Sequence, residues 1–249
     1  MNKCIVVSLY DFTGEAVMPW AKNGYECHCY DIQHEGSKVD YFSGGGSIHY
    51  LKSDLHKDSS IDVLTDKYKS LEVAFGMAFP VCTDLAVSGA AWFKSKAQVD
   101  PMFQVKAVSY AVMCSDFFTQ LGVPFFVENP VSVLATKWRK PDLSFHPYDF
   151  GGYIPESESE HPTWPEYIAP KDAYKKKTCL WVGGGFVMPQ SKPVEPEKYH
   201  GNGYSTSMMK LGGKSQRTKN IRSATPRGFS VAVYEANKIL KLDNPNKPV

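Results

Sequence analysis

The chain has 249 residues, of which 43% are hydrophobic and 22% charged, and these values fit one globular domain with an elaboration rather than a fibrous or disordered protein. The formal net charge is only +2, which excludes a generally basic protein, so binding to a polyanion would need a local basic patch. Six cysteines lack the spacing of a disulfide framework, and the apolar run before Asp11 is too short for a signal peptide or a membrane span, so we expect a soluble, cytoplasmic monomer.

The first thirty residues predict a strand, a turn, a helix and a second strand. The strands are expected at Cys4 to Tyr10 and Tyr25 to Tyr30, with the turn at Asp11 to Gly14 and a helix within Glu15 to Asn23. Asp31 follows the second strand. A glycine turn lets backbone amides approach a ligand, and an acid placed there can accept ribose hydroxyls. The pattern indicates a cofactor that contains adenosine, although a dinucleotide fingerprint would have three glycines.

Two short patterns resemble a phosphate-binding loop and a metal site, but neither has the full set of residues that such a site needs. Gly44-Gly45-Gly46 has no following Gly-Lys-Ser/Thr, so it does not indicate a phosphate-binding loop. Cys27-His28-Cys29 lies on a predicted strand, where successive side chains point to opposite faces. No second pair follows at zinc-like spacing, so we expect strand packing here and no metal site.

Two apolar runs later in the chain end in residues that can perform chemistry. Leu71 to Phe79 predicts a buried parallel strand and is followed by Pro80 and Cys82, and Val123 to Val127 predicts another strand, followed by Glu128. A helix is expected between them, from Asp100 to Gln120. In an open α/β sheet, ligands bind at the carboxyl ends of the strands. The alternative is that Cys82 only packs in the core and Glu128 only caps a helix.

From Pro141 the composition changes to Pro, Gly, Tyr, Trp and Glu-Ser repeats, so little regular helix is expected up to Pro170. A strand is predicted at Thr178 to Val182, directly after three lysines at 175 to 177. Residues 186 to 222 are rich in Gly, Ser, Lys and Arg without apolar periodicity, and an amphipathic helix is expected at Phe229 to Leu240.

The segments Phe-Pro-Val-Cys-Thr-Asp-Leu-Ala-Val-Ser-Gly (79 to 89) and Phe-Phe-Val-Glu-Asn-Pro (125 to 130) together resemble the catalytic loop and the Glu-Asn-Val strand end of DNA cytosine-5 methyltransferases, in particular the short phage-associated type. The resemblance implies that Cys82 is a nucleophile and Glu128 a general acid. It also implies S-adenosylmethionine as cofactor, methyl transfer to carbon 5 of cytosine, and flipping of the target base out of the duplex.

The resemblance extends more loosely to the cofactor loop and to the lysines. Ser8 to Gly14 is similar to the family's Asp-Leu-Phe-x-Gly-x-Gly loop, but departs from it at Phe12 and Glu15, where that loop has glycines. Lys175 and Lys177 stand where the family has arginines in a Gln-x-Arg-x-Arg strand, and would stabilise the pyrimidine carbonyl or nearby phosphates. The residues that the resemblance assigns to the cofactor are Tyr10, Asp11, Phe12, Thr13, Gly14, Asp31, Ile32, Asp54, Leu55 and Pro80.

The implied fold is an α/β, Rossmann-like methyltransferase domain formed by residues 1–182 and 223–249. A small irregular target-recognition insertion is expected at 183–222. Double-stranded DNA is the implied partner, and phosphate contacts are expected from the basic side chains of this insertion, which are Lys210, Lys214, Arg217, Lys219 and Arg222.

Two other functions stay open from the sequence. Val81 and Phe12 depart from the family pattern, which leaves room for a catalytically idle DNA-binding relative. The short recognition region and the low net charge would also suit an enzyme that acts on free cytosine nucleotides, or one that transfers a different one-carbon group. An exocyclic-amine methyltransferase is the least supported, because Asn129-Pro130 lacks the Pro and aromatic residue of that motif.

Overall fold

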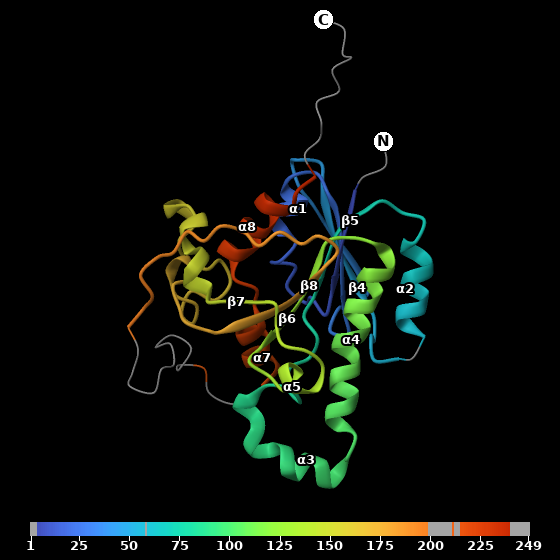
Figure 1. Ribbon diagram of the computed structural model, residues 1–249. Coiled ribbons are helices and arrows are strands. Elements are labelled where there is room, and N and C mark those ends of the chain that lie inside the picture. Colours follow the sequence, from blue (N-terminus) through green and yellow to red (C-terminus); the bar gives the residue numbers. More distant parts are fainter. Residues whose placement is uncertain (1–3, 58, 199–210, 212–214, 240–249) are drawn as a thin grey trace, which may run out of the picture.

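The computed structural model describes residues 4–57, 59–198, 211 and 215–239. Within them, a central sheet of eight strands has the order β3-β4-β2-β1-β5-β6-β8-β7, with helices on both faces (Figure 1). The strands are β1 (Ile5–Leu9), β2 (Glu26–Asp31), β3 (Ser37–Tyr41), β4 (Ser47–Lys52), β5 (Val73–Ala78), β6 (Phe125–Pro130), β7 (Leu143–Phe145) and β8 (Thr178–Gly183).

The sheet is mostly parallel. β4, β2, β1, β5 and β6 run in one direction, whereas β3 is antiparallel to β4, and β8 is antiparallel to both β6 and β7. All five residues of β1 are buried, as expected for a central parallel strand that is covered on both faces. This architecture confirms the Rossmann-like α/β fold class predicted from the sequence.

Two layers of helices enclose the sheet. On one face, α2 (Ser60–Tyr68) and α4 (Phe103–Leu121) pack their aromatic side chains against alternate residues of β1, among them Val7 and Leu9. On the other face, α1 (Met18–Lys22) and α8 (Arg227–Asn237) pack against Val6 and its neighbours. None of the helices in the described part of the chain is long and apolar enough to cross a lipid bilayer.

The long helix α4 shows how the sequence sets these contacts. Gly122 ends it with a φ of +68°, a left-handed conformation that glycine adopts without cost. On β5, a Cβ at Gly76 would lie 2.2 Å from the Phe118 ring. A glycine at this position therefore lets α4 approach the sheet closely.

The sequence predictions fail mainly at element boundaries. Glu128 and Asn129 lie inside β6 rather than after it, because the antiparallel ladder with β8 extends that strand to Pro130. Within the basic segment, where no periodicity was apparent, Gln216–Ser223 forms the helix α7. The other short elements are the helices α3 (Phe93–Val99) and α5 (Leu134–Lys137) and the 3₁₀ turns Val87–Trp92, Pro147–Tyr153, Glu156–Glu158 and Pro170–Asp172.

The strand order creates a topological switch point. From β1 the chain builds the sheet outward through β2 and β4, whereas β5 and β6 are added on the other side of β1. Loops that leave β1 and β5 at their carboxyl ends therefore separate, and a crevice between such loops is where open α/β sheets bind ligands. Cys82 follows β5 and Asp11 follows β1, so both lie at this position.

Candidate active site

The loop that carries Cys82 is fixed to the end of β6. Asn129 donates from Nδ2 to the Pro80 carbonyl at 2.8 Å, in a buried hydrogen bond. Backbone bonds join Val87 to Val131 at 3.0 Å and Val133 to Leu85 at 2.9 Å. These contacts hold the two sequence motifs against each other, although they lie about fifty residues apart in the chain.

Cys82 begins a tight turn, with its carbonyl accepting the amides of Leu85 at 3.0 Å and Ala86 at 2.8 Å. Its side chain is partly buried. Burial and then the nearby Glu128 carboxylate raise the pKa of the thiol, while Lys176 and a backbone amide lower it. Since only the thiolate is strongly nucleophilic, this thiol needs local help to react near neutral pH.

Glu128 points into a small cavity with an aromatic wall. Phe79, Phe145 and Phe229 line this cavity together with Glu128 and Lys176. The glutamate as a whole is only partly buried, yet its Oε1 atom is excluded from solvent and has no hydrogen-bond partner within the described residues. Burial raises the pKa of the carboxyl group, and the Lys176 ammonium opposes this rise. A carboxyl group in such a setting is suited to hold and donate a proton.

Of the three consecutive lysines, Lys176 is the one that lies in the cavity with Glu128. It shares the cavity with Thr178, two residues further on, and its Nζ donates to the Arg222 carbonyl at 2.7 Å. Lys175 and Lys177 are exposed and act instead on His146, whose pKa they help to lower after the larger effect of burial. In extended chain, side chains alternate, so the lysine that shares a face with Thr178 is the one at 176.

This placement predicts the reactivity of the thiol. Because the Lys176 charge lowers the pKa of Cys82, Lys176→Met should raise it and slow the alkylation of Cys82 by iodoacetamide at pH 8, by about three- to tenfold. Lys175→Met is the matched control and should leave the rate unchanged. Peptide mapping of the alkylated protein gives the rate at Cys82 itself. Equal slowing in both variants would contradict the placement.

The loop after β1 is organised around Asp11. Its carboxylate accepts hydrogen bonds from Ser8 Oγ and from the Gly14 amide, both at 2.8 Å, and it is almost completely buried. Burial raises the pKa of Asp11 despite these two donors. The carboxylate is thus used to shape the turn at Asp11 to Gly14, and Thr13 adds a weak contact at 3.5 Å.

Tyr10 is the strained residue of this end of the sheet. Its φ is +58°, which is uncommon for a residue with a side chain and occurs preferentially at functional sites. Its hydroxyl is buried and has no hydrogen-bond partner among the described residues. Burial raises its pKa, with smaller contributions from charges that include Asp54 and Asp31. A buried hydroxyl without a partner is consistent with a polar ligand in this position.

The acids assigned to the cofactor lie where the sequence predicts. Asp31 ends β2 and its Oδ1 accepts the Gln33 amide at 2.8 Å, and Asp54 accepts the His56 amide at 3.2 Å. His56 stacks on Tyr110 with ring centroids 3.9 Å apart. Ile32 is exposed, whereas Leu55 and Pro80 are buried. The structure therefore brings these acids to the carboxyl edge, next to Tyr10.

Phe12 and Glu15, which stand where the family's loop has glycines, each contact another side chain. Phe12 stacks on His34 with centroids 5.8 Å apart, and His34 contacts the Asp11 carbonyl at 3.1 Å. Glu15 lies 3.2 Å from His161, which belongs to the irregular segment after β7. Both side chains therefore contact other parts of the fold at positions where the family has glycines.

The expected DNA-contacting residues are only partly described. Lys210 and Lys214 lie outside the described residues, whereas Arg217, Lys219 and Arg222 are exposed on α7. The helix is attached to the loop after β2, because Gln33 accepts from Gln216 at 2.9 Å and from Asn220 at 3.1 Å. α7 lies at the end of the sheet toward which β5 and β6 run, as do α3 and α5 (Figure 1).

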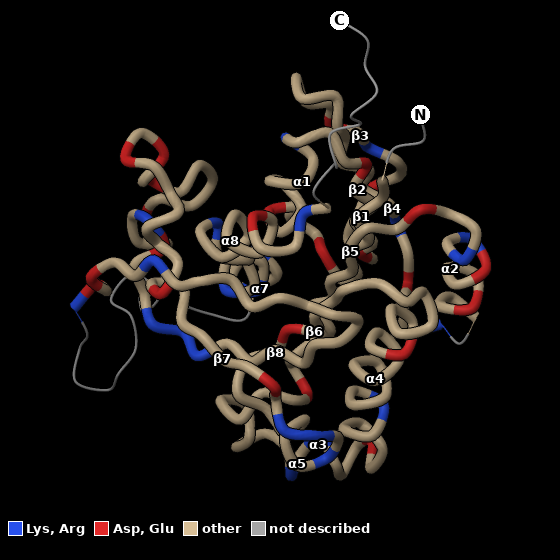
Figure 2. The backbone as a smooth tube through the Cα atoms, turned by 45° about the horizontal axis from the view of Figure 1, so that its top comes forward, with Lys and Arg blue, Asp and Glu red and all other residues tan. Residues whose placement is uncertain are grey.

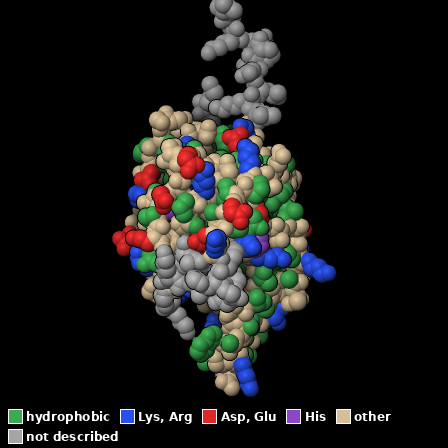
Figure 3. All heavy atoms as spheres, turned by 90° about the vertical axis from the view of Figure 1, so that its left-hand side faces the viewer, with side chains coloured by type: hydrophobic (Ala, Val, Ile, Leu, Met, Phe, Trp, Pro, Cys, Tyr) green, Lys and Arg blue, Asp and Glu red, His purple; other side chains and the backbone are tan. Residues whose placement is uncertain are grey.

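In the part of the chain that the structure describes, the Lys and Arg residues are not gathered into one large basic face (Figure 2). Lys and Arg are spread over several elements, among them α3 and α4, and are interspersed with Asp and Glu (Figure 2). On the side seen in Figure 3, acidic and basic side chains lie next to one another. Lys171 and Glu156, for example, form an ion pair at 2.5 Å. Any nucleic-acid contact must therefore rely on a local group of cations.

Two residues near the site are not predicted from the sequence. The sequence shows Asn129 only as part of a motif, although its side chain joins the Cys82 loop to β6, and the family resemblance points to Lys175 and Lys177 rather than to Lys176. The contact of Asn129 with Pro80 depends on the parallel pairing of β5 with β6, which joins segments that are far apart in the sequence. For Lys176, the alternation from Thr178 was the available signal.

Similarity to known proteins is found among solved structures. No family model matches the sequence, and no curated protein is significantly similar to it. A prophage-encoded protein of E. coli, whose assigned activity as a DNA modification methyltransferase is itself a proposal, is similar with a TM-score of 0.45 and 10% sequence identity. The match covers 78% of this chain and 53% of that one, so this chain spans about half its length. The candidate site therefore stands on this chain's own residues: a thiol, a buried carboxyl group and an ammonium gathered at the switch point of a Rossmann-like sheet.

Proposed function

We propose that this protein transfers a methyl group from S-adenosylmethionine to carbon 5 of cytosine in double-stranded DNA. The observation that carries the proposal is the position of Cys82 and Glu128 at the carboxyl ends of β5 and β6, where the Glu128 carboxylate raises and the Lys176 ammonium lowers the pKa of the Cys82 thiol, and Lys176 also lowers that of Glu128. A structural cysteine would not need a buried, unpartnered carboxyl group beside it.

Methyl transfer to carbon 5 of cytosine requires a nucleophile and a proton donor, which are the roles of Cys82 and Glu128. Carbon 5 of cytosine is a poor nucleophile until a thiolate adds to carbon 6, so the Cys82 sulfur forms that bond. Glu128 gives a proton to ring nitrogen 3, which offsets the negative charge that develops in the ring. The cofactor supplies an electrophilic methyl group, which carbon 5 takes up. Loss of the carbon 5 proton to a base and return of the nitrogen 3 proton to the Glu128 carboxylate then restore the ring and release the Cys82 thiolate.

Lys176 contributes a positive charge to this site. It lowers the pKa of the Cys82 thiol, which increases the thiolate fraction, and it lies beside the carboxyl group that would contact the base. Lys175 and Lys177, which the family resemblance assigns to the site, are exposed next to His146. We assign them to contacts outside the base pocket, such as flanking phosphates.

The experiment that tests the proposal compares acceptors. The full-length protein is incubated with S-adenosylmethionine labelled in the methyl group and with duplex DNA, dCMP or no acceptor, followed by nucleoside analysis. We expect label in 5-methylcytosine from the duplex only. Label in dCMP alone would show a nucleotide-modifying enzyme, and cofactor-independent DNA binding without transfer would show an idle relative. Either result would overturn the proposal.

The ribose role of Asp31 has its own test. Asp31→Asn keeps the shape and can still accept the Gln33 amide, but it loses the charge. We expect cofactor binding to weaken by about 1.5–3 kcal/mol, with a smaller effect on turnover at saturating cofactor. Calorimetry of cofactor binding measures this. Asp40→Asn, on the antiparallel strand β3, is the control, and unchanged affinity in Asp31→Asn would rule out the ribose contact.

Phosphate contacts from α7 predict a particular dependence on salt. Each phosphate neutralised by a cation adds about 0.9 to the slope of log affinity against log salt. Replacing Arg217 and Lys219 together by Gln should flatten the slope by roughly 1–2 in a fluorescence-anisotropy titration. The control replaces Lys38 and Lys69, which form exposed ion pairs elsewhere, and removes the same charge. An equal change in both double variants would mean that α7 does not contact the phosphates.

A further inference from the structure

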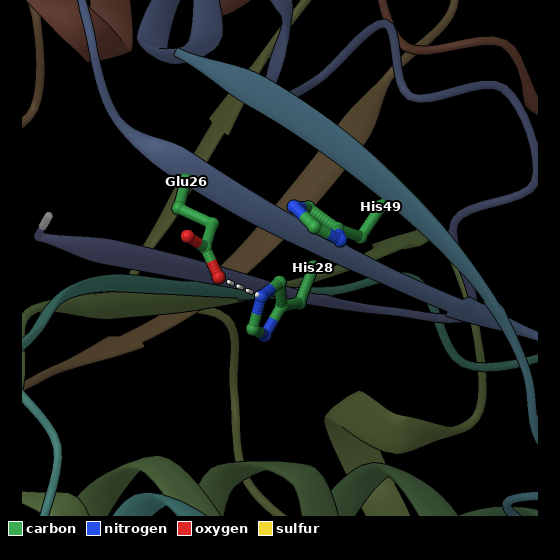
Figure 4. Close-up of side chains that lie close together, drawn as sticks. All are labelled: Glu26, His28 and His49. Atoms are coloured by element: carbon green, nitrogen blue, oxygen red, sulfur yellow. Dashed lines mark hydrogen bonds and ion pairs between the residues drawn. The ribbon is translucent and has the colours of Figure 1, made fainter. Parts of the chain in front are cut away.

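A second group of chemically capable side chains lies away from the candidate active site. Glu26 and His28 come from β2 and His49 from β4, and their ligand atoms all lie within 4.8 Å of one another. Figure 4 shows the Glu26 carboxylate turned toward the His28 ring, with His49 on the neighbouring strand. Glu26 Oε1 is 2.8 Å from His28 Nε2, and the two imidazole rings have centroids 5.1 Å apart.

The sheet itself produces this arrangement. Glu26 and His28 are two residues apart on one strand, so their side chains project from the same face. His28 is paired with His49 in the parallel ladder of β2 and β4. Cys27 and Cys29 face the opposite side, where they belong to the core under α1 and α8, in agreement with the alternation predicted for this strand. The potential metal ligands are therefore Glu26, His28 and His49, and not the consecutive residues Cys27, His28 and Cys29.

The His28 ring is oriented by a chain of hydrogen bonds. Its Nδ1 contacts the Tyr68 hydroxyl at 2.5 Å, Tyr68 contacts the Tyr30 hydroxyl at 2.7 Å, and Lys67 donates to Tyr30 at 2.9 Å. With Nδ1 held by Tyr68, the Nε2 atom is directed toward Glu26. Ligating histidines in metal sites are fixed in this way, through a hydrogen bond at the second ring nitrogen.

We propose that Glu26, His28 and His49 bind a divalent transition-metal ion of the Zn²⁺ type. Two imidazole nitrogens and one carboxylate oxygen form a donor set that Zn²⁺ accepts, with a further position left for water. Imidazole ligands disfavour Mg²⁺ and Ca²⁺, which prefer oxygen. The chain supplies all three ligands, and the Glu26–His28 contact is close to the separation of ligands around one ion.

The place of this cluster points to a structural role. Glu26 is the first residue of β2, and all three residues lie in the first half of their strands, whereas Cys82, Asp31 and Asp54 lie at or beyond the carboxyl ends. A metal ion here would join β2 to β4 and stabilise this half of the sheet without contacting the candidate active site. The proposal is therefore independent of the proposed function.

Thermal unfolding of the metal-free full-length protein, with and without Zn²⁺, tests the site. A ligand that binds only the folded state at about one hundred times its Kd should raise the Tm of a chain of this size by roughly 5–10 °C. Mg²⁺ should give no rise. Isothermal titration with Zn²⁺ should show one ion bound per chain. The Cys4→Ser, Cys82→Ser double variant removes the two partly exposed thiols and should bind Zn²⁺ like the original protein.

Three variants assign the ligands. His49→Ala and Glu26→Gln should each weaken Zn²⁺ binding by at least about 10–100-fold, and both residues are partly exposed, so their metal-free Tm should stay near that of the original protein. If the His49→Ala variant does not fold, the Zn²⁺ affinity of Glu26→Gln still tests the proposed site. His56→Ala, at an exposed histidine beyond β4, is the control. No Zn²⁺-dependent rise in Tm, or the same rise and affinity in Glu26→Gln, would overturn the proposal.

Discussion

Replacement of Cys82 by Ser is expected to lower methyl transfer by more than about a thousandfold, while the affinity for S-adenosylmethionine stays nearly unchanged. A serine hydroxyl is far less acidic than a thiol, so the attacking anion is not available near neutral pH. The loop geometry should survive, because the Cys82 carbonyl, and not its side chain, accepts the turn's hydrogen bonds from Leu85 and Ala86.

The matched control is Cys4→Ser. Cys4 is also partly exposed, but it lies just before β1 and its Sγ contacts Glu72 Oε1 at 3.1 Å, at the opposite end of the sheet from Cys82. Transfer of label to duplex DNA measures activity, and calorimetry measures cofactor binding. Turnover above a few per cent in Cys82→Ser would remove Cys82 from the role of nucleophile. Loss of cofactor affinity in the same variant would point instead to a structural role.

Glu128→Gln is expected to slow methyl transfer by about 10²–10⁴-fold, the usual contribution of a positioned general acid. Gln keeps the size of the side chain and can still donate a hydrogen bond, but it cannot deliver a proton. Burial raises the pKa of Glu128, so a larger fraction of the carboxyl group holds a proton near neutral pH than for an exposed glutamate. The variant removes this proton and leaves the thiol in place.

Thiol reactivity separates this loss from simple misfolding. The Glu128 carboxylate raises the pKa of Cys82, so its replacement should lower that pKa and increase alkylation of Cys82 at pH 8, even though methyl transfer falls. Both rates can be measured on the same preparation. A parallel fall of alkylation and methyl transfer would indicate a damaged loop and would contradict the role of general acid.

A trapped adduct tests the same step directly. Duplex DNA with 5-fluorocytosine at the target should give a denaturant-stable protein–DNA complex that depends on S-adenosylmethionine, because fluorine cannot leave carbon 5 as a cation. The adduct should map to the peptide that contains Cys82 and should form more slowly in Glu128→Gln. If the ordinary duplex is methylated at carbon 5 but its fluorinated counterpart gives no adduct, the covalent mechanism is wrong even though the product is right.

The sequence by itself determined which segments are strands and which residues follow them. Apolar runs such as Leu71 to Phe79 predict buried strands through local composition alone, and the structure contains β5 there, at Val73–Ala78. Because parallel strands end at one edge of a sheet, the placement of Cys82, Asp11 and Asp31 at that edge follows from the order of elements. These inferences depend on near neighbours in the chain, and they succeeded for that reason.

Only the tertiary structure decided which side chains face one another. The choice among Lys175, Lys176 and Lys177 depends on the register of β8 beside β6, and a shift of one residue in that register would exchange the exposed lysines with the partly buried one. The same is true of His28 and His49, which are joined by the pairing of β2 with β4. Strand register is set by contacts between distant segments, so the period of two in the sequence gives the alternation but leaves its phase relative to the neighbouring strand undetermined.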